Sequence, residues 1–264
     1  MEPVYTPVVH FARGLFAAQG LRVQRTGHEA IPQTGGGVVA INHIGYLDFA
    51  LAGYAFKDVG RLVRFMAKKE VFDMKGVGSL MRGMKHIPVD RSAGAGAYRE
   101  AVAALQRGEL IGVFPEATIS RSFELKEFKT GAVRMAQEAG VPIIPTIVWG
   151  SQRIWTKDHP KKLGRTGVPI IVTVGRPIEA PADADPAQLT EQLKAEMKQM
   201  LDRAKAQYPP MTGEDLAFLP KALGGTAPTL DEAAEMEEQE RQRRAARKAE
   251  KAAKAAKKKG SAQP

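Results

Sequence analysis

Two side chains five residues apart carry the chemistry most easily proposed from this sequence. The segment NHIGYLD, residues 42–48, follows a strongly apolar run. On one continuous helix His43 and Asp48 would point about 140° apart and could not meet. If a strand ends at His43 and a helix begins near Gly45, the carboxylate can fold back onto the ring. An imidazole held in this way is a general base, worth roughly 10² to 10⁴ in rate; a purely structural hydrogen bond is the alternative.

Three further segments each follow or enter an apolar run: residues 87–91 (IPVDR), 114–122 (FPEATISRS) and 141–145 (VPIIP). With the H-x4-D segment, and in this order, they resemble the four blocks of the glycerolipid acyltransferase family, of the lysophosphatidate acyltransferase type. The family blocks are H-x4-D, a block that ends in Arg, F-P-E-G-T-R-S and V-P-[I/L/V]-x-P. The resemblance covers about residues 35–180. A lone H-x4-D is common in proteins, so the specificity lies in the ordered set.

The resemblance implies a mechanism for the pair. His43 would take the proton from an acceptor hydroxyl, and Asp48 would orient the ring and stabilise the imidazolium. The hydroxyl would attack an acyl thioester directly, because the chain has no cysteine and no G-x-S-x-G segment. Backbone amides of the third block are the expected donors to the developing oxyanion. No metal site is expected, because no second histidine lies near His43.

The resemblance also implies the residues that bind the acceptor. Arg91 would bind its phosphate with paired guanidinium donors, and Lys68, in the stretch AKKE, would add a second charge. Glu116 and Thr118 would bind or order the glycerol hydroxyls. Arg91, Glu116 and Thr118 match positions of the family blocks, and Lys68 matches a separate family stretch, Ala-Lys-x-Glu.

Two positions of the third block depart from the family pattern. Ala117 stands where the family has glycine, and Ile119 stands where it has arginine. Arg121, two places further on, is the expected replacement for that guanidinium, although the shift changes its direction. The identity of the acceptor is therefore predicted less sharply than the type of reaction.

The elements that must position these residues follow from hydrophobic periodicity. Runs of strand length occupy residues 38–41, 62–66, 86–89, 111–114, 143–148 and 170–174. Helical patterns occupy residues 47–56, 77–84, 97–106, 131–138 and 189–206. This alternation predicts an α/β fold with a mostly parallel central sheet covered by helices, and the resemblance implies a glycerol-3-phosphate acyltransferase-like fold. Ligands in such sheets bind beyond the carboxyl ends of the strands.

The composition sets the class of protein and of partner. The chain has 264 residues, of which 44% are hydrophobic, so it can bury a full core. It has no cysteine, which excludes a disulfide scaffold and thiolate catalysis. Its net charge of +10 favours an anionic partner. Low aromatic content (6%) and the lack of a nucleic-acid-binding motif make a nucleic-acid partner unexpected.

The organisation along the chain predicts four parts. Residues 1–20 form an amphipathic N-terminal helix, residues 21–210 the acyltransferase domain, residues 211–228 a linker, and residues 229–264 a low-complexity charged helical tail. In the tail, residues 231–240 carry six acids and no base, whereas residues 241–264 carry ten bases and one acid. Thr229 and Glu232 have the spacing of a capping box.

The leading hypothesis is an O-acyltransferase that moves a fatty acyl chain from acyl-CoA or acyl carrier protein to a lysophospholipid, most simply 1-acyl-glycerol-3-phosphate. The donor is a substrate, and no cofactor is expected. The start of the chain lacks a secretory-signal layout and no run is suited to span a bilayer, so we expect a cytoplasmic protein held peripherally on an anionic membrane face. The alternatives are an inactive lipid-binding protein with this fold, and an acyltransferase for a different lysolipid or glycolipid acceptor.

Overall fold

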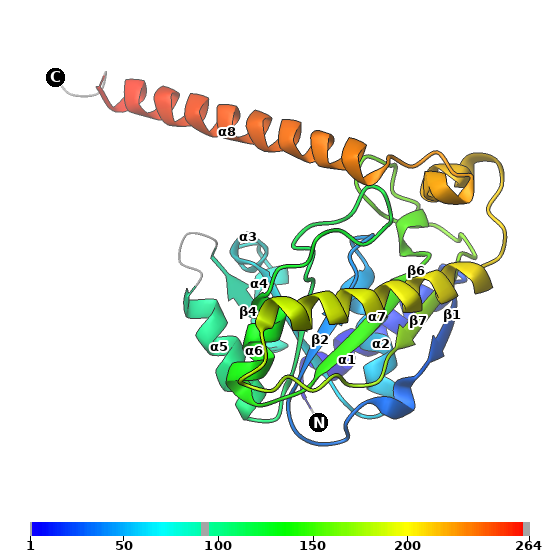
Figure 1. Ribbon diagram of the computed structural model, residues 1–264. Helices are drawn as coiled ribbons and strands as arrows, with labels where there is room; N and C mark the ends of the chain where they lie inside the picture. Colours follow the sequence, from blue (N-terminus) through cyan, green and yellow to red (C-terminus); the bar gives the residue numbers. More distant parts are fainter. Residues whose placement is uncertain (1, 91–94, 261–264) are drawn as a thin grey trace. The chain divides into compact units, whose positions relative to one another are not determined.

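A computed structural model describes residues 2–90 and 95–260 (Figure 1). The chain divides into two compact units. The first comprises Met1–Ser120 and Leu125–Thr212, and the second comprises Arg121–Glu124 and Gly213–Pro264. Among the described residues, no helix combines the length and the apolar character needed to cross a membrane.

The first unit is built on a seven-stranded sheet with the order β1-β7-β6-β2-β5-β3-β4. The strands are β1 (Arg22–Thr26), β2 (Gly37–Ile41), β3 (Val63–Lys68), β4 (Ile87–Val89), β5 (Leu110–Val113), β6 (Ile143–Trp149) and β7 (Pro169–Val174). All neighbouring pairs are parallel except β6 and β7, which run antiparallel. The predicted mostly parallel α/β sheet is thus confirmed. Strand β1 has no counterpart in the sequence prediction.

Helices cover both faces of this sheet (Figure 1). The α-helices of the first unit are α1 (Tyr5–Ala18), α2 (Asp48–Asp58), α3 (Lys69–Phe72), α4 (Val77–Gly83), α5 (Ala95–Gln106), α6 (Gly131–Ala139) and α7 (Pro186–Gln207), with 3-10 turns η1 (His28–Ala30) and η2 (Ser151–Arg153). Helices α1 and α2 lie on one face, and α5, α6 and α7 lie on the other. The sheet is therefore covered on both sides, as its uninterrupted apolar strands require.

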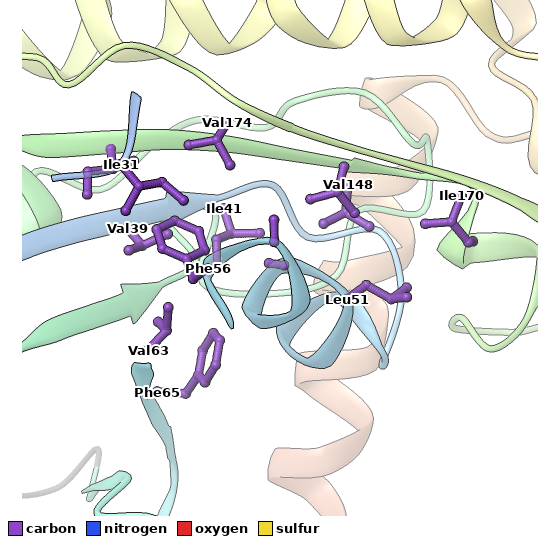
Figure 2. Close-up of a cluster of buried hydrophobic side chains, with 14 of the residues drawn as sticks. Ile31, Val39, Ile41, Leu51, Phe56, Val63, Phe65, Val148, Ile170 and Val174 are labelled. Atoms are coloured by element: carbon purple, nitrogen blue, oxygen red, sulfur yellow. The ribbon is translucent and has the colours of Figure 1, made fainter. Parts of the chain in front are cut away.

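The main core lies between α2 and the central strands. Figure 2 shows Leu51 and Phe56 of α2 directed at strand side chains that include Ile41 and Val148. All four side chains are fully buried. Because α2 begins at Asp48 and is packed here along its length, the core fixes where its first residue lies against the end of β2.

The second unit consists of short 3-10 turns and one long helix. These are η3 (Gly213–Phe218), η4 (Lys221–Leu223) and α8 (Leu230–Gly260). The predicted capping box starts the helix: the Thr229 amide donates to the Glu232 carboxylate (2.8 Å), and the Glu232 amide donates to the Thr229 hydroxyl (3.2 Å). Within this unit Phe123 contacts Phe218, with ring centroids 6.4 Å apart.

Candidate active site

Directly after β2, the side chain of Asn42 forms a clamp to β6 that fixes the start of the loop carrying His43. Asn42, fully buried, donates through its amide nitrogen to the Val148 carbonyl (3.0 Å) and accepts from the Val148 amide (2.7 Å). The clamp joins the ends of β2 and β6, which are parallel neighbours. His43 therefore emerges at the carboxyl edge of the sheet, where open α/β sheets place their ligands.

The structure brings His43 and Asp48 together. Their Nδ1 and Oδ2 atoms are 3.0 Å apart, and the same oxygen accepts the amides of Ile44 (2.7 Å) and Gly45 (2.8 Å). Asp48 is the first residue of α2 and is fully buried. Because a carboxylate can only accept, Nδ1 carries the ring proton and Nε2 keeps its lone pair. In this arrangement the free ring nitrogen is able to accept a proton.

The third block holds His43 from the other side, after β5. The His43 ring stacks on Phe114, with centroids 4.0 Å apart and an interplanar angle of 20°. The Ser120 amide donates to the His43 carbonyl (2.7 Å), and the His43 amide donates to the Glu116 carboxylate (2.8 Å). The side chain of His43 keeps 19% of its surface exposed, so a reactant can reach it.

Glu116 lies beneath this loop with both carboxylate oxygens bonded to backbone. Oε1 accepts the His43 amide and Oε2 accepts the Lys126 amide (3.1 Å). Only 4% of the residue is exposed. The pKa of Glu116 is raised to about 8, chiefly by burial and to a smaller extent by the charge of Asp48, although the two amides and the Lys126 charge oppose the rise. The carboxyl group expected to bind glycerol thus contacts the protein's own backbone.

The two departures from the family pattern have different structural settings. Ala117 has a φ of 61°, the left-handed region that favours glycine. Ile119 is 3% exposed and packs in the interior, where it offers no charge to a ligand. The Thr118 hydroxyl between them accepts the Lys157 ammonium (2.7 Å), a cation that sequence reasoning did not single out.

The three residues expected to bind the phosphate have different structural settings. Lys68 ends β3 and is exposed. Arg91 lies outside the described residues. Arg121 belongs to the second unit, where its guanidinium donates to Glu240 (2.9 Å) and lies 4.0 Å from Glu237, both on α8.

Two backbone amides of the third block already donate hydrogen bonds within the protein. The Ser120 amide binds the His43 carbonyl, and the Ala117 amide donates to the Phe114 carbonyl (2.9 Å). The expectation that third-block amides stabilise the oxyanion therefore does not extend to these two. Among the described residues, no group of three or more His, Asp or Glu side chains is placed to hold a metal ion.

Sequence reasoning missed the segment after β6, which includes Ser151 and Thr156. The Ser151 hydroxyl donates to Asp48 Oδ1 (2.5 Å), and the Thr156 hydroxyl donates to the Ile44 carbonyl (2.7 Å). The available signal was a Gly-Ser pair directly after a long apolar strand. That strand is a neighbour of β2, so its following residues emerge beside His43.

The fold and the site together define a class: an α/β enzyme with a carboxylate-held imidazole at the carboxyl edge of its sheet. The family model described as "Acyltransferase" matches residues 22–149. A 1-acyl-sn-glycerol-3-phosphate acyltransferase of Bacillus subtilis is 30% identical over 65% of this chain and 84% of its own length. A protein of the same name from Borreliella burgdorferi is 28% identical, over 53% of this chain and 56% of that protein.

Among solved structures, the 1-acyl-sn-glycerophosphate acyltransferase PlsC of Thermotoga maritima has the same fold, with a TM-score of 0.65. The two share 23% sequence identity over 78% of this chain and 81% of that one. The chain therefore belongs to the acyltransferase family, and it is an O-acyltransferase of this type.

Proposed function

We propose that this enzyme transfers a fatty acyl group from acyl-CoA or acyl carrier protein to the free hydroxyl of 1-acylglycerol-3-phosphate, giving phosphatidic acid. The names of the relatives from Bacillus and Borreliella support the acceptor. The contact that carries the mechanism is the 3.0 Å pair between His43 Nδ1 and Asp48 Oδ2, which leaves Nε2 as the proton acceptor.

In the proposed reaction the acceptor oxygen attacks the thioester carbonyl while His43 Nε2 takes its proton. The carbon–sulfur bond then breaks, and the imidazolium returns the proton to the departing thiolate. An ester and a free thiol result, with no covalent enzyme intermediate. Asp48 keeps the ring oriented and stabilises its charged form throughout.

We propose Lys68, Arg91 and Thr118 as acceptor ligands, by their match to the family blocks. For Glu116 the geometry supports a different role: its carboxyl group fixes the backbone at His43. Arg121 would bind the acceptor only if Glu240 released it.

The test measures thiol release and lipid product with acyl-CoA or acyl carrier protein and a panel of lysolipids. His43→Ala is expected to lower kcat by roughly 10² to 10⁴. His28→Ala, which changes a partly exposed histidine on η1, is the matched control and keeps wild-type turnover. Unchanged turnover in His43→Ala would remove this residue from the chemistry.

A second candidate acceptor is a lysolipid with a different head group. Ile119 is buried where the family has arginine, which supports this candidate. In the same panel, preferred acylation of a lysolipid without a terminal phosphate would replace lysophosphatidate as the acceptor while leaving the role of His43 intact.

We also propose that the enzyme works peripherally on the cytoplasmic face of an anionic membrane. Large exposed apolar side chains support this: Phe11 (74%) and Leu15 on α1, Met74 between α3 and α4, and Val77 and Leu80 on α4. The net charge of +10 would add attraction to anionic lipid. Cosedimentation with phosphatidylglycerol vesicles should exceed that with phosphatidylcholine vesicles, and Phe11→Ser should weaken both. Equal pelleting of wild type and variant would contradict the assignment of α1.

A further inference from the structure

Ser151 contacts the catalytic carboxylate on the side away from the histidine. Its hydroxyl donates to Asp48 Oδ1 at 2.5 Å, and both residues are fully buried. Ser151 opens the turn η2 directly after β6, 103 residues along the chain from Asp48. This contact is therefore made by the tertiary fold, not by the H-x4-D segment itself.

The two oxygens of Asp48 are bonded by different parts of the molecule. Oδ2 faces the His43 ring and the amides of Ile44 and Gly45, all from its own loop. Oδ1 faces the Ser151 hydroxyl. A carboxylate that is hydrogen-bonded through both oxygens is held against rotation about its Cβ–Cγ bond. The loop and Ser151 therefore together set the orientation of the Asp48 carboxylate plane relative to the imidazole.

The segment that carries Ser151 is itself fixed against the catalytic loop. The Tyr46 amide donates to the Trp155 carbonyl (2.9 Å), and the Thr156 hydroxyl binds the Ile44 carbonyl. Glycine at position 45 makes the approach possible, since a Cβ there would lie 3.0 Å from the Ser151 hydroxyl oxygen and 3.1 Å from the Trp155 carbonyl oxygen. The donor is thus held in place before any substrate binds.

We propose that Ser151 is a positioning residue of the acyl transfer: it holds the Asp48 carboxylate in the plane that orients His43 and limits the basicity of the ring. The proposal rests on the proposed general-base role of His43. A nucleophilic role for Ser151 does not fit the geometry, because its hydroxyl is buried and donates to Asp48.

Removing the hydroxyl has two expected effects on the reaction. Ser151→Ala leaves Oδ1 without this donor, so kcat falls about ten- to a hundredfold, the range that one hydrogen bond to a charged group corresponds to. The KM values stay within about twofold, since the hydroxyl is buried away from the substrates. Without this donor Oδ1 carries more negative charge, which favours the charged imidazolium, so the acid limb of the pH–rate profile is expected to move to higher pH. The other acid close to this pair is Glu116, which all variants retain.

Two further variants separate positioning from stability. Thr190→Val deletes a buried hydroxyl that donates to the Pro186 carbonyl on α7 and contacts neither Asp48 nor the loop of His43. Whatever its effect on Tm, it is expected to leave kcat and the acid limb in place. Ser151→Cys keeps a weaker donor in nearly the same volume, and it carries the test if the alanine variant does not fold. Its kcat should lie between those of wild type and alanine, with the acid limb moved in the same direction.

The ring titration of His43, followed by NMR in wild type and Ser151 variants, needs no substrate. An upward shift in the variant, together with lower kcat and unchanged KM, supports the proposal. Wild-type kcat in the variant overturns it, and so does a loss of kcat without a shift of either the acid limb or the His43 titration. If the wild type itself transfers no acyl group, the proposed function fails, while the NMR titration still decides whether Ser151 acts on the pair.

Discussion

The buried carboxyl group of Glu116 should make the stability of this protein fall as pH rises. Its pKa is about 8 in the folded state, against 4.5 for the unfolded chain, because it is almost entirely removed from water. Between these values the native state binds one more proton than the unfolded state. The contribution of Glu116 to the free energy of unfolding is therefore fully present below pH 4.5. It is lost as pH rises from 4.5 to 8, at about 1.4 kcal/mol per pH unit and about 5 kcal/mol in total.

Glu116→Gln removes this titration while keeping the shape of the side chain. At pH 5 the variant should be less stable than wild type by about 1–3 kcal/mol, because its amide nitrogen must face one of the two backbone amides that now donate to Glu116. As pH rises the wild type loses its advantage, so the two stability curves should cross between about pH 6 and pH 7.

Urea unfolding of both proteins from pH 5 to pH 8.5 measures this difference, and all titrations that the two share cancel from it. Glu70→Gln, which changes an exposed acid on α3, controls for the loss of a carboxyl group. Parallel curves for wild type and Glu116→Gln would refute the argument, because they would mean that Glu116 binds its proton equally in the folded and unfolded states.

Two more perturbations have a sign set by the structure. Ala117→Gly should raise the free energy of unfolding by about 1 kcal/mol, since the φ of 61° strains an L residue; thermal unfolding measures it, and a lower Tm would contradict the strain. Burial and, to a smaller extent, the charge of Arg64 lower the pKa of His86 to about 4, so this group's stabilisation, present above pH 6.5, is lost as pH falls through 4, by about 3 kcal/mol. His86→Asn, whose carbonyl can still accept the Phe65 amide now bound by Nδ1 (3.0 Å), should remove that acid sensitivity in urea titrations; an unchanged acid dependence would contradict the assignment.

The buried strands were predictable because uninterrupted apolar runs of strand length in the sequence indicate strands that are buried. Runs such as residues 38–41 and 143–148 lie inside β2 and β6, whose residues are all buried. Strand β1 was missed because it is an edge strand whose burial alternates between exposed and intermediate, and its five residues are mostly polar. Burial says nothing of strand direction, so the antiparallel pairing of β6 and β7 was also missed. The missing helix between these two strands was the available signal, since a parallel crossover needs one.

The sequence predicted the contact of the candidate site that joins residues close together in the chain. It did not predict the contacts between residues that are far apart in the chain. The meeting of His43 and Asp48 follows from a strand ending where a helix begins, five residues apart. The bonds from Asp48 to Ser151 and from Glu116 to His43 span 103 and 73 residues, and no spacing rule reports such pairs. For Glu116 the residue type suggested a ligand, whereas the tertiary fold uses its oxygens to satisfy buried backbone amides.

From the order of the strands we expect that the reaction type and the acceptor can vary separately. The central strand β2 carries His43, and its parallel neighbours β6 and β5 carry Ser151 and the third block at the same edge. The base is therefore held from three strands by contacts that involve neither Ala117 nor Ile119. The cation proposed for the acceptor's phosphate, Lys68, lies on β3, one strand further out. We therefore expect substitutions at Ala117 and Ile119 to change the head group that is accepted while the contacts that hold His43 stay the same.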